Sequence, residues 1–384
     1  MSRFLSLLSL VSLSLVGLAN AGSSCVAFDV SWNLLAFGFN GKDYSAGTQD
    51  SWASGTATDI TTTGRPPFNG AHTSCYLSQF TNAIYVMGAD TSSPSSVHIY
   101  DATAKSWSIQ SVTTNGFDPA SATAILDHDT NVFYALSKGE IFSLDMGLLK
   151  AANTSALSWT DVQNPGLGDN YEPVMALAQN HVHFLNVPDV AAGSAKIFVI
   201  HFSFMQPEPQ SYGNFPATHG QATSFFKDTG VQQEFAFIPD DGSAVYVINV
   251  ETNTTQTLKG PTVKDPNASY FASIDSLIQL SSSGSVSYIP YKADTPSANS
   301  AASWTSLSIL PSAASSDSDS DSGSGSSGSG SSSGGQGSGS SGTPSGSARG
   351  AAATSGGVSA TLPSISTGFV MGGAFVFAVF ASLL

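Results

Sequence analysis

Three histidines have the spacing that comes closest to a metal site in this sequence. His181 and His183 lie two residues apart in a strand-like run, so both imidazole rings would point to one face of that strand. His201 ends the next strand-like run, and imidazole nitrogens grouped in this way are ligands for zinc or copper. Hydrogen-bonded or exposed histidines of a β-sheet explain the pattern more simply. We therefore predict no metal and no other cofactor, and keep these three as the candidate ligands.

No familiar catalytic motif accompanies them. The sequence has no GxSxG nucleophile elbow, no HExxH and no phosphate-binding loop. A pair of catalytic carboxylates for glycoside hydrolysis remains an alternative, since the two residues could come from distant parts of the chain. Asp and Glu number 27 against 12 Lys and Arg, for a net charge of −15, and the basic residues are scattered singly. This balance argues against nucleic acid as a partner, and we assign no catalytic residue.

The two cysteines, Cys25 and Cys75, each stand in the first strand-like run of their own part of the chain. An even pair in a secreted protein is typical of a disulfide, and secretion is indicated by residues 1–21. That segment has a basic residue at Arg3, an apolar run over residues 4–18 and a small-x-small cleavage site at its end. It is predicted to be a signal peptide that is removed.

The C-terminal segments predict an anchor on a flexible stalk. Residues 312–347 are almost entirely Ser and Gly, and the stalk they begin, residues 312–355, should be disordered. Residues 368–384 form an uncharged apolar tail, preceded by a polar spacer and by three small residues that begin at Ser355. This arrangement is the signal for a glycosylphosphatidylinositol (GPI) anchor, with attachment at Ser355 and removal of residues 356–384. A retained tail anchor is the alternative, but it would normally be longer and flanked by basic residues.

Three N-glycosylation sequons lie between the strand-like runs, where a glycan can be accommodated. They begin at Asn153, Asn253 and Asn267.

The element that must position all these residues is a repeat. A hexamer with Val or Ile second and an aliphatic residue or Tyr fifth recurs five times, at intervals of about 40–56 residues. The copies are residues 96–101, 140–145, 196–201, 244–249 and 285–290. Each repeat holds several short strand-like runs separated by turn residues, and none can bury its apolar face alone. We predict an all-β fold over residues 22–311, a β-propeller with six four-stranded blades. Seven blades remain the alternative if the shortened first unit hides a split blade.

The strand–turn–strand order, with a tyrosine-bearing strand and then Trp107 in the second unit, resembles the kelch repeat of galactose-oxidase-like propellers. The resemblance is degenerate, because the kelch double glycine is reduced to Gly88 and Ala89 in one unit and is absent from the others. It implies a fold and little about function. The copper site of those relatives needs a Cys cross-linked to Tyr, which this chain lacks if its two cysteines pair.

Together these features resemble a fungal cell-wall or plasma-membrane glycoprotein, held on the outer face of the membrane by its lipid anchor. The function predicted is a monomeric head that binds a glycan or protein ligand without catalysis. One alternative is a surface glycan-active enzyme with acidic residues at the channel mouth. The other is a structural cell-wall glycoprotein.

Overall fold

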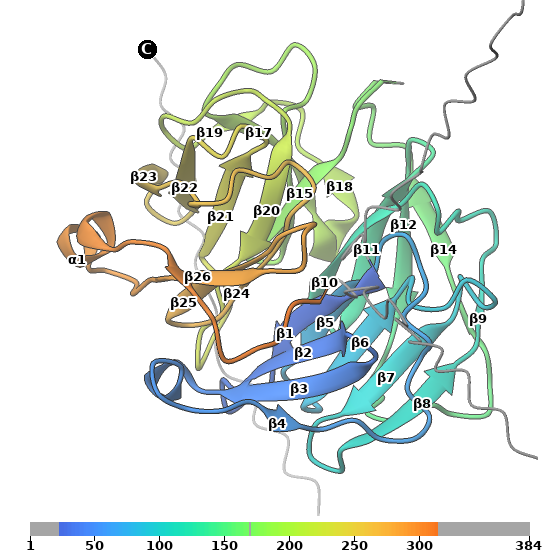
Figure 1. The fold of residues 1–384 in the computed structure, drawn as a ribbon. Helices are drawn as coiled ribbons and strands as arrows, with labels where there is room; N and C mark the ends of the chain where they lie inside the picture. Colours follow the sequence, from blue (N-terminus) through green and yellow to red (C-terminus); the bar gives the residue numbers. More distant parts are fainter. Residues whose placement is uncertain (1–22, 169, 314–384) are drawn as a thin grey trace, which may run out of the picture. The chain divides into compact units, whose positions relative to one another are not determined.

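The computed structural model describes residues 23–168 and 170–313, and these form a β-propeller with six antiparallel blades (Figure 1). The predicted signal peptide, nearly all of the Ser/Gly-rich stalk and the predicted anchor signal lie outside the described residues. Within the described part, no helix is long and apolar enough to span a membrane.

The first three blades follow one another along the chain, each with its strands in sequence order from the axis outward. Blade 1 contains β1 (Cys25–Phe28), β2 (Leu34–Phe39), β3 (Lys42–Gly47) and β4 (Thr58–Asp59). Blade 2 contains β5 (Ser74–Ser78), β6 (Ala83–Met87), β7 (Val97–Asp101) and β8 (Ser106–Gln110). Blade 3 contains β10 (Thr123–Asp127), β11 (Val132–Ser137), β12 (Glu140–Asp145) and β14 (Thr160–Gln163). The short strands β9 (Val112–Thr113) and β13 (Leu157–Ser158) pair in parallel between blades 2 and 3.

The last three blades continue the ring. Blade 4 contains β15 (Val174–Ala178), β16 (His181–Leu185) and β17 (Ser194–Val199), with β18 (Phe204–Met205) and β19 (Gln210–Ser211) both paired to β17. Blade 5 contains β20 (Gly220–Ser224), β21 (Glu234–Pro239), β22 (Ala244–Asn249) and β23 (Thr254–Lys259). Blade 6 contains β24 (Ser269–Ala272), β25 (Ser276–Leu280), β26 (Val286–Pro290) and β27 (Thr305–Ser306). The helical pieces are short: η2 (Gln49–Ser51), η3 (Ile200–Phe202) and α1 (Pro296–Ala301).

The recurring hexamers are the third strands of blades 2 to 6, β7, β12, β17, β22 and β26. Blade 1 is a complete four-stranded sheet as well, although its third strand, β3, reads KDYSAG and lacks the hexamer pattern. The predicted six-bladed fold is therefore confirmed. The seven-blade alternative is wrong, because the first unit is one continuous sheet of consecutive strands.

Turn chemistry closes the hairpins as the sequence suggests. Asn40 and Gly41, between β2 and β3, both have positive φ angles of 50° and 77°. Paired left-handed residues give the turn a twist that matches that of the flanking strands, and Asn followed by Gly adopts this conformation most readily.

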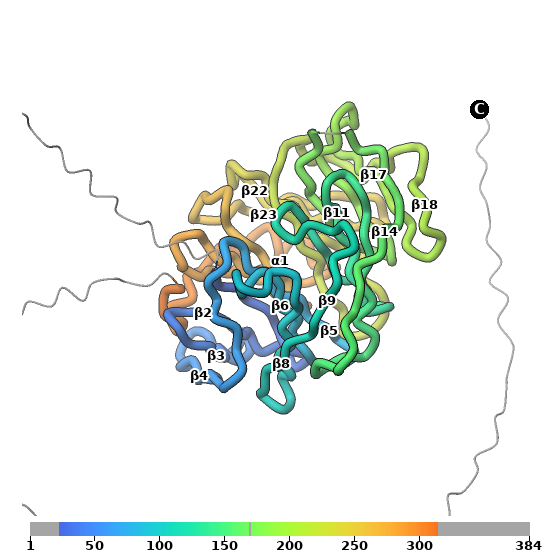
Figure 2. The backbone as a smooth tube through the Cα atoms, turned by 90° about the vertical axis from the view of Figure 1, so that its right-hand side faces the viewer, coloured from blue at the N-terminus to red at the C-terminus, as the bar shows by residue number. Residues whose placement is uncertain are grey.

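Six apolar clusters lie between neighbouring blades, one at each junction of the ring. The junction that closes the ring packs Phe28 and Trp52 of blade 1 against Ile278 and Val286 of blade 6. Trp52 and Tyr288 meet edge to face at this seam, with 4.7 Å between ring centroids. In the described residues no blade combines strands from both ends of the chain, so no strand pairing closes the ring, and apolar side chains pack across the seam. Figure 2 shows the blue first blade beside the orange last one.

Candidate functional site

A cavity of about 570 Å³ lies on the propeller axis, at the end where all six inner strands begin. We call this the axial cavity and its open end the mouth. Every blade contributes an inner-strand residue to its wall: Val26, Tyr76, Thr123, Met175, Gln221 and Tyr270. The volume is that of a small-molecule site.

Blade 2 builds the rim of the mouth from two segments that approach closely. A Cβ atom on Gly70 would lie 1.7 Å from the carbonyl oxygen of Gly88, and one on Gly88 would lie 2.1 Å from the carbonyl oxygen of His72. Only glycine allows backbones to meet in this way. The Gly88 that the kelch comparison singled out therefore shapes the rim.

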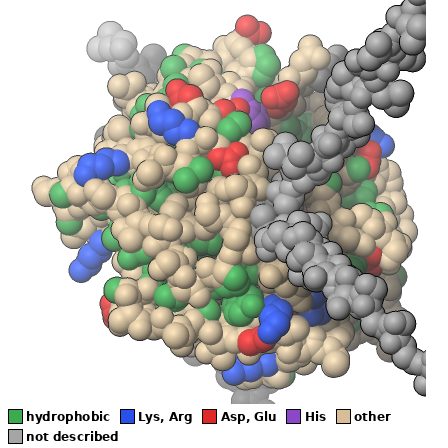
Figure 3. Space-filling view, in the orientation of Figure 1, with side chains coloured by type: hydrophobic (Ala, Val, Ile, Leu, Met, Phe, Trp, Pro, Cys, Tyr) green, Lys and Arg blue, Asp and Glu red, His purple; other side chains and the backbone are tan. Residues whose placement is uncertain are grey.

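His72 and Asp90 are the charged or titratable groups of the rim, and Asp90 is the single carboxylate among the residues lining the cavity. Its Oδ1 accepts hydrogen bonds from the Ser92 hydroxyl, at 2.6 Å, and from the Ser92 N–H, at 2.8 Å. These bonds lower the pKa of Asp90. No Lys or Arg lines the cavity within the described structure, and on the face drawn in Figure 3 charged side chains are scattered among polar and apolar ones.

The wall below the rim is made of inner-strand backbone and neutral side chains. The Tyr76 hydroxyl donates to the carbonyl oxygen of Ala124 on the next blade, at 3.2 Å. Burial raises the pKa of Tyr76 to about 12, so its phenol stays neutral. Deeper down, the Ser224 hydroxyl bridges the carbonyl oxygen and the N–H of Leu177, at 2.6 and 3.1 Å. The inner-strand wall thus has no charged side chain, and it mixes polar groups with apolar side chains such as those of Val26 and Met175.

The far end of the axis is closed by the connection between β20 and β21, residues 225–233, which we call the plug loop. Phe226, near the start of this loop, is 6% exposed, and its ring stacks on Phe271 at a 7° interplanar angle. The ring of Trp32 lies 5.7 Å from that of Phe226, and the ring of His128 lies 4.4 Å away, both between centroids. Aromatic rings from four blades therefore form the floor.

Hydrogen bonds tie the plug loop to the blades around it. Phe226 N–H donates to Ser273 O of blade 6 at 3.2 Å. Trp32 Nε1 of blade 1 donates to Asp228 at 3.2 Å, and Gln79 Nε2 of blade 2 donates to Lys227 O at 3.2 Å. A further bond runs from Gln179 N–H of blade 4 to Gln232 O at 2.8 Å. The axial cavity is consequently blind, open at the mouth and closed at the floor.

The floor was not predicted from the sequence. The segment 127–129 forms a turn, in which Asp127 accepts from the Thr130 hydroxyl and from Asp129 N–H. His128, within it, is partly exposed and faces Phe226, and desolvation of its ring lowers its pKa to about 4. The one local signal was the pair of consecutive aromatics, Phe225 and Phe226, at the end of a strand-like run.

The three candidate metal ligands do not converge. His183 is buried, and its Nε2 lies 2.9 Å from the Tyr212 hydroxyl. His181 does share its strand face, but the two ring centroids are 6.4 Å apart. His201 instead pairs with the amide of Asn180 at 3.2 Å. Among the described residues, no group of three or more His, Cys, Asp or Glu side chains is placed to hold a metal ion.

All three sequon asparagines have exposed side chains, as a glycan would require. Asn153 caps its own turn by accepting from Ser155 N–H at 2.9 Å, and Asn253 occupies the turn between β22 and β23 with a φ of 53°. Asn267 lies two residues before Ser269, which lines the axial cavity. Glycosylation at these sites stays a prediction.

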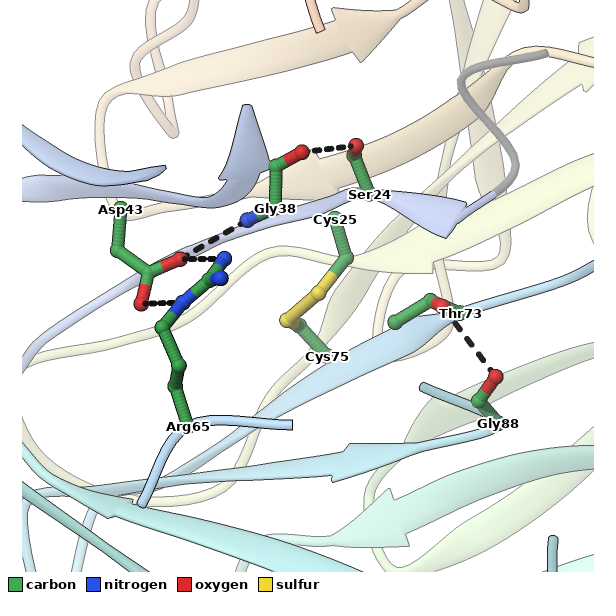
Figure 4. The surroundings of a disulfide bond; sticks show 8 residues. All are labelled: Ser24, Cys25, Gly38, Asp43, Arg65, Thr73, Cys75 and Gly88. Atoms are coloured by element: carbon green, nitrogen blue, oxygen red, sulfur yellow. Dashed lines mark hydrogen bonds and ion pairs between the residues drawn. A yellow bond between two sulfur atoms is a disulfide. The ribbon is translucent and has the colours of Figure 1, made fainter. Parts of the chain in front are cut away.

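Cys25 and Cys75 form a disulfide between the inner strands of blades 1 and 2, with 5.8 Å between their Cα atoms (Figure 4). The predicted pairing is confirmed, and such a bond is typical of an extracellular or secreted protein.

Figure 4 also shows a buried ion pair beside the disulfide. Asp43 is fully buried and accepts two hydrogen bonds from the Arg65 guanidinium, at 2.9 and 3.0 Å. Its Oδ1 also accepts from Gly38 N–H at 3.0 Å. Because Arg65 belongs to the link between blades 1 and 2, the pair holds that link against β3.

Comparison with known proteins extends to the fold alone. No protein-family model matches the sequence, and no curated protein is detectably similar to it. YjhT is a solved structure similar over 74% of this chain and 97% of its own, with 10% identity and a TM-score of 0.49. PorZ, a surface component of the type-IX secretion system of Porphyromonas gingivalis, is similar over 73% of this chain at 13% identity and a TM-score of 0.40. The chain spans 32% of the length of PorZ. A nidogen/laminin complex matches over 60% of this chain and 76% of its own, with 10% identity and a TM-score of 0.38.

Proposed function

We propose that the propeller head is a non-catalytic binding module whose ligand enters the axial cavity from the mouth. The observation that carries this proposal is the blind cavity, to which every blade contributes and which the plug loop closes. A preformed concave site with convergent polar groups is the usual form of a ligand site.

The cavity lining favours binding over glycan cleavage. Glycoside hydrolysis uses two carboxylates, one on each side of the bond to be broken. Asp90 is the single carboxylate among the lining residues, and its Oδ1 is already bonded to Ser92. The chemistry of the site is therefore that of recognition.

A substitution that fills the mouth tests the proposal. Ser74 is exposed at the start of β5 and lines the cavity, so Ser74→Trp should block entry and leave the blade intact. Ser106→Trp is the matched control, since Ser106 is exposed at the start of β8 in the same blade and does not line the cavity. Glycan and peptide arrays probed with the purified full chain should identify a ligand. Its affinity should fall about tenfold or more in Ser74→Trp, a loss of at least 1.4 kcal/mol, and stay unchanged in Ser106→Trp.

Two results would contradict this function. The first is a ligand that binds both variants equally, which would place the site elsewhere. The second is a change in the mass of the bound glycan after incubation, which would indicate catalysis.

The same proposal places the head on the outer surface of the cell. The secretory signal, the disulfide and the C-terminal signal around Ser355 support a GPI-anchored protein. Phosphatidylinositol-specific phospholipase should release the protein from intact membranes. A protein that resists release and still carries residues 368–384 in its C-terminal peptide would refute the lipid anchor.

A further inference from the structure

The wall of the axial cavity presents backbone hydrogen-bonding groups to its contents. In an antiparallel pair, alternate residues direct their N–H and C=O groups toward and away from the partner strand. Leu177 directs both groups away from β16, because both bond to Ser224 of the next blade. Met175, two residues nearer the mouth on the same strand, must therefore present its backbone to the axis.

The same parity holds on two other inner strands. Ala272 N–H bonds to the Thr223 hydroxyl of the neighbouring blade at 3.3 Å, so the backbone of Tyr270, two residues earlier, also faces the axis. On β10 the carbonyl oxygen of Ala124 accepts from Tyr76 across the blade junction. Met175 and Tyr270 thus direct backbone donors and acceptors toward the axis from two blades, in a part of the wall that has no charged side chain.

An anionic ligand has no counter-charge in this cavity. No Lys or Arg lines it within the described structure, and the one carboxylate among the described lining residues, Asp90, would repel an anion. Removing a charged group from water without a partner costs several kcal/mol. A ligand rich in hydroxyl groups, by contrast, can exchange its bonds to water for bonds to the wall.

The closed floor adds a second constraint, on the shape of the ligand. Phe226 and Phe271 stack across the axis, so a polymer cannot pass through the ring and must enter by one end. A peptide that enters by its C-terminal end brings a carboxylate, for which the described lining supplies no Lys or Arg, whereas the free, non-reducing end of a glycan chain is uncharged unless it is specially modified.

We propose that the axial cavity binds the neutral, non-reducing end of a glycan, held by the backbone edges of the inner strands and by the neutral side chains around them. Gln221 is the amide among those side chains, and the partly exposed rings of Tyr76 and Tyr270 border the cavity. This inference rests on the proposed function and specifies its ligand.

Matched probes test the charge and the end separately. The full chain is titrated with neutral trisaccharides and with the same trisaccharides carrying a terminal sialic acid or sulfate group. The neutral members should bind, and their charged counterparts should bind at least about tenfold more weakly. Trisaccharides whose non-reducing end is blocked by a bulky substituent should also lose binding, and saturation-transfer signals should be strongest on the terminal sugar.

The possible outcomes distinguish a failure of this inference from a failure of the proposed function, which is ligand binding in the axial cavity. Charged or end-blocked glycans that bind as well as the neutral ones, and that are displaced in Ser74→Trp, would overturn the inference and leave the cavity as the site. Short peptides that bind in its place, with the same sensitivity to Ser74→Trp, would do so as well. Binding that is insensitive to Ser74→Trp would instead refute the proposed function. In every case Ser106→Trp reports whether the substitution itself disturbs the head.

Discussion

At the scale of single residues, the Asp43–Arg65 pair is the most consequential polar contact near the N-terminus. The Asp43 carboxylate has no exposure to solvent, and Arg65 satisfies both of its oxygens. The guanidinium also lies over the ring of Phe68, 4.9 Å from its centroid. A buried charge that loses its partner is strongly unfavourable, which makes the contribution of this pair measurable.

Arg65→Met should destabilise the head by about 3–5 kcal/mol, because it leaves the Asp43 carboxylate buried without its partner. Lys42→Met is the control, since it removes a salt bridge to Asp59 whose two side chains are 55% and 44% exposed, and solvent screens such a pair so that its loss changes stability little. Urea unfolding of both variants provides the comparison. If Arg65→Met and Lys42→Met lose the same free energy of unfolding, the burial of Asp43 adds nothing to the cost of breaking its ion pair.

His183 makes stability depend on pH. Burial lowers its pKa to about 3 in the folded head, whereas an unfolded histidine titrates near 6.5. Below pH 6.5 the unfolded chain therefore takes up a proton that the folded head does not. The stabilising contribution is fully present above pH 6.5 and is lost as the pH falls toward 3.

We expect the free energy of unfolding to fall between pH 6.5 and 4, by at most about 1.4 kcal/mol per pH unit for each such histidine. His183→Gln should be less stable at pH 7 and show a shallower fall, because glutamine does not titrate. Denaturant titrations at several pH values give the change in the free energy of unfolding with pH. If that change is the same in His183→Gln as in the wild-type protein, this account is wrong.

At the scale of elements, the plug loop is the connection with the largest structural role. It leaves blade 5 and bonds to blades 1, 2, 4 and 6, so it acts as a cross-brace at the floor end of the ring. Phe226 is nearly buried there, whereas Phe80, in the β5–β6 turn on the same side of the ring, is 56% exposed.

Phe226→Ala should therefore cost about 3 kcal/mol or more, since it leaves a void among the aromatic rings of the floor. Phe80→Ala, the same substitution at the exposed site, should change stability by no more than about 0.5 kcal/mol. Thermal unfolding measures both. If the two variants melt alike, the plug loop is not packed against the floor as described.

At the scale of the whole molecule, blade 1 is joined to its two neighbours by different kinds of interaction. On one side, within the described residues, apolar packing rather than strand pairing joins it to blade 6. On the other, the Cys25–Cys75 disulfide ties its inner strand to that of blade 2 across a separation of 50 residues in sequence. The covalent bond thus holds the blade that lies nearest the start of the described chain.

Replacing both cysteines by serine should lower stability by about 4 kcal/mol, the loop-closure entropy of a bridge of this span. Hydrogen exchange should then be fastest in β1 to β4, because blade 1 keeps only its packing contacts. Wild-type protein under reducing conditions should behave in the same way. Exchange that begins in another blade would show that the disulfide does not limit the opening of the ring.

The sequence by itself determined the repeating plan of the head. Strand composition and turn residues act over a few neighbours, so the hexamers and the Asn40–Gly41 turn could be recognised locally. A period of about 40–56 residues then indicated stacked blades, and a pair of cysteines in adjacent units indicated the disulfide. Blade 1 was the hardest blade to recognise from the sequence, because β3 lacks the recurring hexamer.

Only the tertiary structure decided where the site lies. The floor depends on contacts such as Trp32 to Asp228, which are 196 residues apart and share no local pattern. Whether a histidine can bind a metal also depends on residues that are distant in the sequence. His183 forms a hydrogen bond with the Tyr212 hydroxyl. The axial cavity belongs to no single blade, because it exists only where six inner strands meet around a closed ring.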